Sequence, residues 1–274
     1  MFKGKSELSI MLLILITGSA ITFVATLSYP YMPILLSLSL YGKDEFWEGF
    51  LVNLHNSMFD FLLLVIMVYY FSKKIEEKRR IQSYFENISD VRFLKTEEAT
   101  AKLIGNINRI NENGLYSIDL TKCYLKGAHL KKVKLINSSF MGAELERINL
   151  RNAILDNSDF KGASLKHAQF QGSSVVNAKM RNIKCDGTNF KGATITSCDF
   201  RKAELINSCF KSTNLKNSDF TDVKFDNSDF ERANLLGAKN VDILSLINCK
   251  TLKFAKLDSD LKQRILELNP ELLR

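Results

Sequence analysis

The chain has 274 residues, of which 46% are hydrophobic, and 38 Lys and Arg outnumber 30 Asp and Glu to give a net charge of +8. This length allows more than one folded module. Three histidines, scattered along the chain, are too few to suggest a metal centre or a catalytic triad. The apolar residues are unevenly distributed, so the segments are considered in chain order.

The first apolar segment, residues 8–29, carries no charge. It is long enough to cross a bilayer as a helix. Pro30 and Pro33 would end that helix, and residues 34–40 are predicted to lie at the membrane interface. A cleaved signal peptide is the alternative. The length of the run and the presence of a second apolar segment favour a membrane span.

The second apolar segment covers residues 50–71. Its first half contains Asn53, Asn56 and Asp60, whose spacing places them on one helical face. Polar and ionisable side chains are costly in a membrane and usually face a partner or water. They indicate a polar seam against the first span or a second subunit, or an ion path in an oligomer. Alternatively, the span starts later and this stretch lies among the lipid headgroups.

The flanking charges predict a topology. Lys3 and Lys5 precede the first span, and the second span is followed by Lys73, Lys74, Lys78, Arg79 and Arg80. Positive residues remain on the cytoplasmic side, and such a cluster can also contact anionic lipid. We therefore expect residues 1–72 to form a two-pass hairpin of the bacterial inner-membrane type, in contact with the lipid bilayer, with both termini cytoplasmic.

Residues 73–112 are predicted to be a helical linker. Its first part, to about Asn87, extends the second span. A second helix begins after Thr96, a suitable N-cap, and has Glu97 and Glu98 in its first turn. Its apolar face comprises Ala99, Leu103, Ile104, Ile107 and Ile110. We expect this helix to cover one end of the domain that follows, because repeat domains need caps.

Residues 113–240 show a period of five. Apolar side chains stand at every fifth position from Leu120 to Leu235, in 24 consecutive blocks without an insertion. A small residue usually stands two positions before each of them, as Ala128 does before Leu130. Neither a helical period nor strict alternation fits this pattern. A side-chain pattern that starts again every five residues indicates that the chain turns a corner every five residues. A fixed period of this kind indicates a repeat architecture.

The distribution of phenylalanine predicts the number of sides in each coil. With four sides, residues 20 apart stack, and eight of the nine central Phe residues then fall in two opposite columns: Phe140, Phe160, Phe200 and Phe220, and Phe170, Phe190, Phe210 and Phe230. A three-sided coil would mix Phe and Leu. Four sides give about six coils and a rod roughly 29 Å long.

The blocks also carry a family motif. Ala233-Asn234-Leu235 matches A-(D/N)-L-x-x, Ala143-Glu144-Leu145 nearly matches it, and Ser-Asp-Phe variants end at Phe160, Phe220 and Phe230. This stretch resembles the pentapeptide-repeat proteins. The resemblance implies an all-β solenoid, a right-handed quadrilateral β-helix. The best-known functional relatives are acidic rods that mimic DNA and bind DNA gyrase. Residues 115–240 depart from them, with 20 Lys and Arg against 13 Asp and Glu.

Residues 241–274 are predicted to close the other end of the rod. Asp258 is a suitable N-cap for a helix over residues 259–268, with Leu261, Ile265 and Leu268 on one side. Pro270 then stops the helix. Capping is the expected role, and dimerisation through this end, as in some relatives of the fold, is the alternative.

The predicted surface of the rod divides by charge. A basic stripe comprises Lys131, Arg151, Lys191 and Lys211, and an acidic row on what we expect to be an adjacent corner comprises Asp119, Asp159, Asp199 and Asp219. A charge-poor side comprises Ile136, Ile154, Val176, Thr194, Thr196 and Leu236. An apolar patch on a repeat rod is a candidate partner surface, although scattered exposed apolar residues are also normal.

The sequence does not predict an enzyme. It contains no evident nucleophile–base pair, no metal-ligand spacing and no phosphate-binding glycine loop, so no cofactor or metal is expected. Cys123, Cys185 and Cys198 fall on inward positions, Cys209 faces outward and Cys249 lies beyond the repeats. We expect a membrane-anchored scaffold that binds an unidentified protein through its rod. The alternatives are a regulator that binds nucleic acid or a topoisomerase, which the departure of this basic rod from the acidic relatives disfavours, and a homo-oligomeric membrane assembly that uses Asp60.

Overall fold

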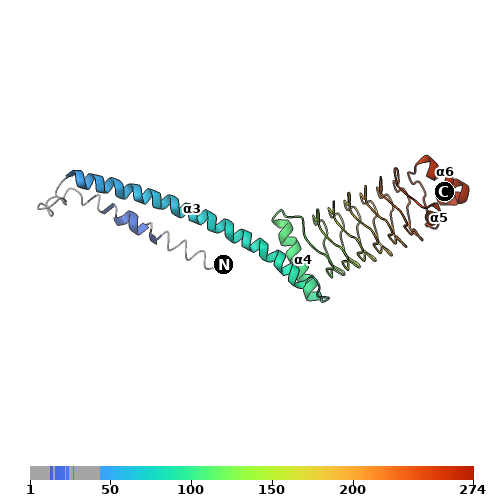
Figure 1. Ribbon diagram of the computed structural model, residues 1–274, viewed down its shortest axis with the longest axis horizontal. Coiled ribbons are helices and arrows are strands. Elements are labelled where there is room, and N and C mark those ends of the chain that lie inside the picture. Colours follow the sequence, from blue (N-terminus) through green and yellow to red (C-terminus); the bar gives the residue numbers. More distant parts are fainter. Residues whose placement is uncertain (1–12, 15, 22, 25–26, 28–43) are drawn as a thin grey trace. The chain divides into compact units, whose positions relative to one another are not determined.

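The structure is a computed structural model (Figure 1) that describes residues 13–14, 16–21, 23–24, 27 and 44–274. Internal contacts divide the chain into two units, Met1–Arg80 and Ile81–Arg274. The predicted first span, residues 8–29, lies only partly within the described residues. Pro30, Pro33 and the predicted interfacial segment lie outside them.

The first long element is α3, a single helix of 48 residues from Asp44 to Val91. It unites the predicted second span with the first part of the predicted linker. By length and composition, it is the one helix of the described residues that could cross a membrane, over Glu48–Val91. The predicted second span therefore lies in a helix whose length and composition would allow it to cross a membrane.

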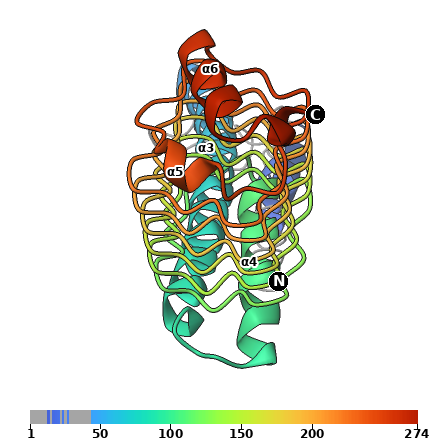
Figure 2. The same ribbon diagram turned by 90° about the vertical axis from the view of Figure 1, so that its right-hand side faces the viewer.

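The next helix, α4 (Glu97–Glu112), begins where the sequence predicts, because the Thr96 hydroxyl accepts a hydrogen bond of 3.1 Å from the Ala99 N–H. Its apolar face, with Leu103, Ile107 and Ile110 fully buried, joins the core of the rod. The Thr100 hydroxyl donates to the Tyr124 carbonyl at 3.3 Å. The helix thus covers the first coil (Figure 2).

The rod consists of stacked coils with four sides each. Parallel bridges join residues 20 apart, from Asp119–Ser139 to Asp219–Lys239. Each five-residue block makes three backbone hydrogen bonds to the next coil, such as Leu125 N–H to Glu144 O and Glu144 N–H to Cys123 O, both 2.9 Å, and Gly127 N–H to Glu146 O at 2.8 Å. The third bond falls at the corner, where the chain turns, so each side has a single residue that bridges to the next coil. For this reason the described residues contain single bridging positions rather than the continuous strands expected of an all-β solenoid.

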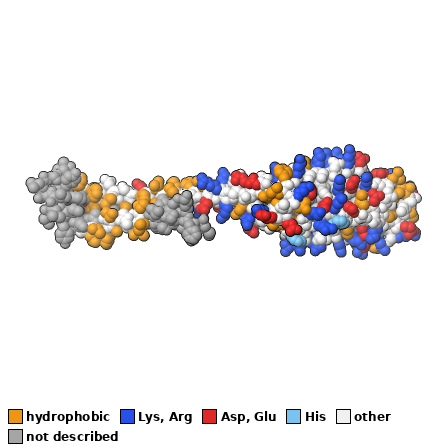
Figure 3. All heavy atoms as spheres, turned by 90° about the horizontal axis from the view of Figure 1, so that it is seen from below, with side chains coloured by type: hydrophobic (Ala, Val, Ile, Leu, Met, Phe, Trp, Pro, Cys, Tyr) orange, Lys and Arg blue, Asp and Glu red, His pale blue; other side chains and the backbone are white. Residues whose placement is uncertain are grey.

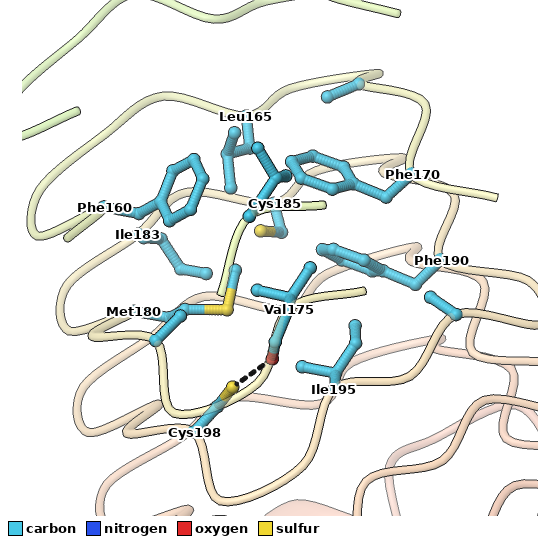
Figure 4. Close-up of a cluster of buried hydrophobic side chains, with 14 of the residues drawn as sticks. Phe160, Leu165, Phe170, Val175, Met180, Ile183, Cys185, Phe190, Ile195 and Cys198 are labelled. Atoms are coloured by element: carbon cyan, nitrogen blue, oxygen red, sulfur yellow. Dashed lines mark hydrogen bonds between the residues drawn. The ribbon is translucent and has the colours of Figure 1, made fainter. Parts of the chain in front are cut away.

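The core follows the predicted columns. The rings of Phe140 and Phe160 stack with their centroids 4.5 Å apart, and Phe210 lies 4.9 Å from both Phe190 and Phe230. Met180 occupies the gap in the first column, beside Phe160 (Figure 4). All of these side chains are fully buried. The interior is therefore filled by side chains along its whole length.

Bridges between coils continue past residue 240, the predicted end of the repeats. Asp229 bridges to Thr251 and Asn234 to Lys256, each across 22 residues rather than 20. The two additional residues accommodate α5 (Ile243–Leu246), a single helical turn. This insertion interrupts the period of five, so the last coil cannot be recognised from the sequence pattern.

The C-terminal end is closed by α6 (Ser259–Leu268) and a 3₁₀ helix, η3 (Pro270–Leu273). Asp258 does not cap α6 through its side chain as predicted, because its carboxylate accepts a hydrogen bond from the Gly237 N–H at 3.0 Å. Leu261 and Ile265 are buried, but Leu268 is 53% exposed, contrary to expectation. Leu252 N–H donates to Leu272 O at 2.7 Å and ties the chain end to the last coil.

Replacing Phe210 by Ala should destabilise the rod by about 3–5 kcal/mol, because it opens a cavity between two stacked rings. Urea unfolding followed by circular dichroism would measure this. The control is Phe254→Ala, since Phe254 is 62% exposed and has a positive φ of 59°. That change should cost less than about 0.5 kcal/mol. Equal shifts in the two variants would contradict the assignment of the core.

Candidate interaction surface

The buried thiols offer no reactive site. Cys123, Cys185 and Cys198 point inward as predicted, and Cys249 is buried as well. Burial raises the pKa of the Cys123, Cys198 and Cys249 thiols to about 12. They therefore stay protonated and unreactive near neutral pH. Cys209 is half-buried on the outer surface. Within the described part of the chain, no cluster of His, Cys, Asp or Glu is arranged to hold a metal ion.

The charge-poor side forms as one surface in the structure. Ile154 and Thr194 belong to one column of bridges, and Val176 and Thr196 lie in the neighbouring column. Ile136 and Leu236 extend that second column toward the two ends of the rod. Of the six residues, Thr194 is exposed and the others are half-buried. The six residues predicted to share this side are therefore brought together.

One charged residue, Asp156, lies within this side. Its Oδ1 atom accepts hydrogen bonds from the Ser174 hydroxyl at 2.7 Å and from the Val176 N–H at 2.9 Å. The carboxylate is thus held against the rod by neighbouring groups. Lys134 and Lys216 occupy the same two columns farther along the rod, toward the first and last coils.

The basic stripe runs along one corner of the rod, but it is partly neutralised. The Lys211 ammonium group pairs with Glu231 at 2.8 Å and with Asp229 at 3.4 Å. The hydrogen bond to Glu231 is the main reason that the pKa of Lys211 is raised. Arg151 Nε donates to Gln171 Oε1 at 3.2 Å. Lys131 and Lys191 are exposed and form no ion pair with any described residue.

The acidic row occupies a single column of bridges, and each of its members is paired. Asp119 meets Arg92 at 2.6 Å and Asp159 meets Lys179 at 3.6 Å. The remaining pairs involve Arg181 with Asp199 and Arg201 with both Asp199 and Asp219. The row is thus neutralised within the rod. Such a surface does not present the run of free negative charge expected of a DNA mimic.

The arrangement of the three surfaces differs from the expectation. The basic stripe and the acidic row were placed on adjacent parts of the rod. In each coil, however, the chain leaves the basic stripe, crosses the charge-poor side and only then reaches the column of the acidic row. In one coil, for example, it runs from Lys131 through residues 134–136 to Ser139, which lies in the same column as Asp119 and Asp159. The charge-poor side therefore lies between them, with a basic edge and a neutralised edge. Figure 3 shows Lys and Arg side chains spread over the rod with acidic groups among them.

Sequence reasoning missed a feature of the first coil. Residues 120–140 contain five lysines and no Asp or Glu: Lys122, Lys126, Lys131, Lys132 and Lys134. Lys126 pairs with Glu146 of the next coil at 3.1 Å, and Lys134 lies over the Tyr116 ring. The composition of this single coil was the available signal. Sums taken over the whole rod concealed it.

The predicted polar face of the membrane segment lies on α3. Asn53, Asn56 and Asp60 are exposed side chains of this helix. They share one face, as their spacing predicts, and they belong to the unit Met1–Arg80. The surfaces of the rod described above belong to the other unit, Ile81–Arg274.

Comparison with known families agrees with the geometry of the rod. The family described as "Pentapeptide repeat region" matches residues 115–190. The family described as "Pentapeptide repeats (8 copies)" matches residues 183–222 and 213–239. Residues 115–239 therefore belong to the pentapeptide-repeat family. Members of this family fold as right-handed quadrilateral β-helices, in keeping with the four sides found here. No protein of curated function matches the sequence.

Several solved structures are similar to the rod. A pentapeptide-repeat protein from the thylakoid lumen of Arabidopsis thaliana is 20% identical, with 52% of this chain and 77% of that chain covered and a TM-score of 0.30. QnrB1, a plasmid-mediated fluoroquinolone resistance protein, is 16% identical, with 55% and 88% covered and a TM-score of 0.27. HetL from Nostoc sp. is 17% identical, with 56% and 94% covered and a TM-score of 0.15.

Thiol labelling should detect one accessible cysteine in the folded pentapeptide-repeat protein. A maleimide at pH 7 should modify Cys209 rapidly and the four buried thiols only after unfolding, because they are inaccessible and protonated. Mass spectrometry of the intact chain would count the labels. The variant Cys209→Ser should take up no label while folded. Rapid labelling of Cys123 or Cys198 would contradict the inward placement.

Proposed function

We propose that this protein is a membrane-anchored, non-catalytic scaffold whose rod binds a protein partner through the charge-poor side. The observation that carries the proposal is the composition of that side. Between Lys134 and Lys216, successive coils present one charged group, Asp156, and its carboxylate is already satisfied by the rod. A regular, charge-poor side above a core filled by side chains suits the surface of another protein better than a small molecule.

The edges of this side indicate the chemistry of the partner. Ile154 and Val176 offer apolar contact, and Thr194 and Thr196 offer hydroxyl groups. On one edge, the basic stripe keeps unpaired charges, and the acidic row on the other edge is neutralised. A partner with an apolar strip bordered by acidic side chains on one edge would complement this surface.

Membrane anchoring is supported by the first part of α3. Large apolar side chains are exposed there on several faces, including Phe59, Leu62, Leu63, Leu64, Ile66 and Met67. Exposure of so many apolar side chains to water is unfavourable, whereas their exposure to the lipid tails of a bilayer is not. The cations from Lys73 to Arg80 follow this apolar part. We infer a two-pass anchor of the bacterial inner-membrane type with cytoplasmic termini and a cytoplasmic rod.

A nucleic-acid or topoisomerase partner is the second candidate, and the basic stripe is the feature that favours it. Two of the four members of the stripe are already engaged, Arg151 with Gln171 and Lys211 with Glu231. Direct contact with DNA would weaken steeply as salt increases. Absence of DNA binding at low salt would eliminate this candidate as a direct binder.

The partner side is tested by an arginine at Val176. A charge there should weaken partner binding about thirtyfold, corresponding to roughly 2 kcal/mol at an interface hot spot. The matched control is Ile206→Arg, since Ile206 is a half-buried apolar residue at the same repeat position on the opposite side of the rod. The measurement is photocrosslinking in intact membranes from a reactive residue at Thr196, with each variant in turn.

The comparison of the two variants decides the proposal. Loss of one dominant crosslinked partner in Val176→Arg, with retention in Ile206→Arg, is the expected result. Thermal unfolding of both variants should match the parent, so that loss of binding is not loss of folding. If the two variants retain or lose the partner equally, the charge-poor side is not the binding surface.

A further inference from the structure

One face of α3 packs against the first apolar segment within the unit Met1–Arg80. Four residues of α3 are half-buried and one is buried, at spacings of three and four: Leu51, Leu54, Met58, Phe61 and Val65. A Cβ atom on Gly18 would lie 3.2 Å from the Met58 sulfur, so the described part of the first segment contacts this stripe. Figure 1 shows that segment running beside α3. The stripe is apolar throughout.

The polar residues of α3 lie on a different face. Asn53, Asn56 and Asp60 are exposed, and none of their side chains has a hydrogen bond or ion pair with a described residue. At about 100° per residue, Asp60 is directed roughly 160° away from Met58 around the helix. Of the two protein partners that the sequence allowed for this face, the described part of the first apolar segment is therefore not the one that covers it.

The position of Asp60 in the apolar stretch makes this exposure consequential. Residues 50–71 are the apolar part of α3, and Asp60 lies near their midpoint. If α3 spans a membrane, as the proposed function holds, Asp60 lies near the centre of the bilayer. Ionisable groups at that depth face a protein partner or water rather than lipid, because exposure to lipid is costly.

We propose that this polar face is the contact between α3 helices of two copies of the chain. In a twofold contact, both copies present the same residues, so Asn53, Asn56 and Asp60 of one chain meet those of the other. An asparagine amide both donates and accepts, so it can bond with another asparagine and with the Asp60 carboxyl group.

Small residues on the same side of α3 support a close approach. Gly49, one turn before Asn53, has open space where a Cβ atom would lie, and Ser57 is exposed next to Asn56. Small residues let two membrane helices approach closely, and hydrogen bonds between polar side chains then hold them together. This inference rests on the proposed membrane anchoring. It adds a second copy of the chain as the partner of α3.

Cysteine crosslinking of the full-length chain in native membranes tests the inference. In a Cys209→Ser background, which removes the half-buried surface thiol, Asn53→Cys reports on the polar face. The control is Ile66→Cys, since Ile66 is 55% exposed. Residues 53 and 66 are about equally distant from Asp60 along the helix and lie roughly 140° apart around it.

Oxidation should give a disulfide-linked dimer from Asn53→Cys and several-fold less from Ile66→Cys. Adding Asp60→Leu should weaken association by about threefold to twentyfold, the range expected for hydrogen bonds between membrane helices. Asp60→Asn should retain most of the dimer, because an amide still donates and accepts. Asp60→Leu makes the helix more apolar, so a loss of dimer cannot be attributed to failed insertion.

Two results would overturn the inference, and they are distinguishable. If the chain resists alkaline carbonate extraction but the two cysteine positions crosslink equally or not at all, the dimer contact is wrong and the anchoring stands. If carbonate releases the parent chain, the anchoring fails and the dimer contact fails with it.

Discussion

The structure depends on the hydrogen bonds that join each coil to the next in a register of 20 residues. On one side, the Phe160 N–H donates to Lys179 O at 2.7 Å, and the Lys179 N–H donates to Ser158 O at 3.0 Å. The corner residue adds a third bond, from the Gly162 N–H to Arg181 O at 2.8 Å. Three bonds per block are few, so stability comes from repeating them on the four sides of every coil. A one-residue insertion within the rod would misalign every column that follows it. The 22-residue step occurs only at the last coil.

The same register determines the chemistry of the interior. Phe stacks on Phe because equivalent positions lie directly above one another. Inward polar residues are satisfied in the same way. The Ser218 hydroxyl donates to Ile195 O at 3.2 Å and accepts from the Cys198 N–H at 3.1 Å. Serine is therefore tolerated at an inward position that alanine often fills, since buried polar groups are stable when they are hydrogen-bonded.

The interior of the rod is regular, whereas the outward side chains differ among its four sides. The features that can determine function are therefore these differences among the sides. Acidic residues of one column pair with cations of adjacent coils, as Asp159 does with Lys179. Such exposed pairs contribute little to stability. These pairs do, however, neutralise the electrostatic potential on the acidic side of the rod. What remains is a neutral side with a basic edge on the rod and, in the other unit, a polar face on the apolar part of α3.

The sequence alone predicts the repeat, its four sides, its Phe columns and the start of α4. Stacked residues are a constant 20 positions apart, and Thr96 caps a helix that begins at the next residue, so both features can be recognised by reading along the chain. The grouping of Ile154, Val176 and Thr196 followed from the same period. The extra coil past residue 240, the bond from Gly237 to Asp258 and the exposure of Leu268 could not be predicted in this way. These depend on which distant segments meet. The direction of the Asp60 face was decided in the same way, because spacing places polar residues on one face of a helix, and packing alone decides which face is covered.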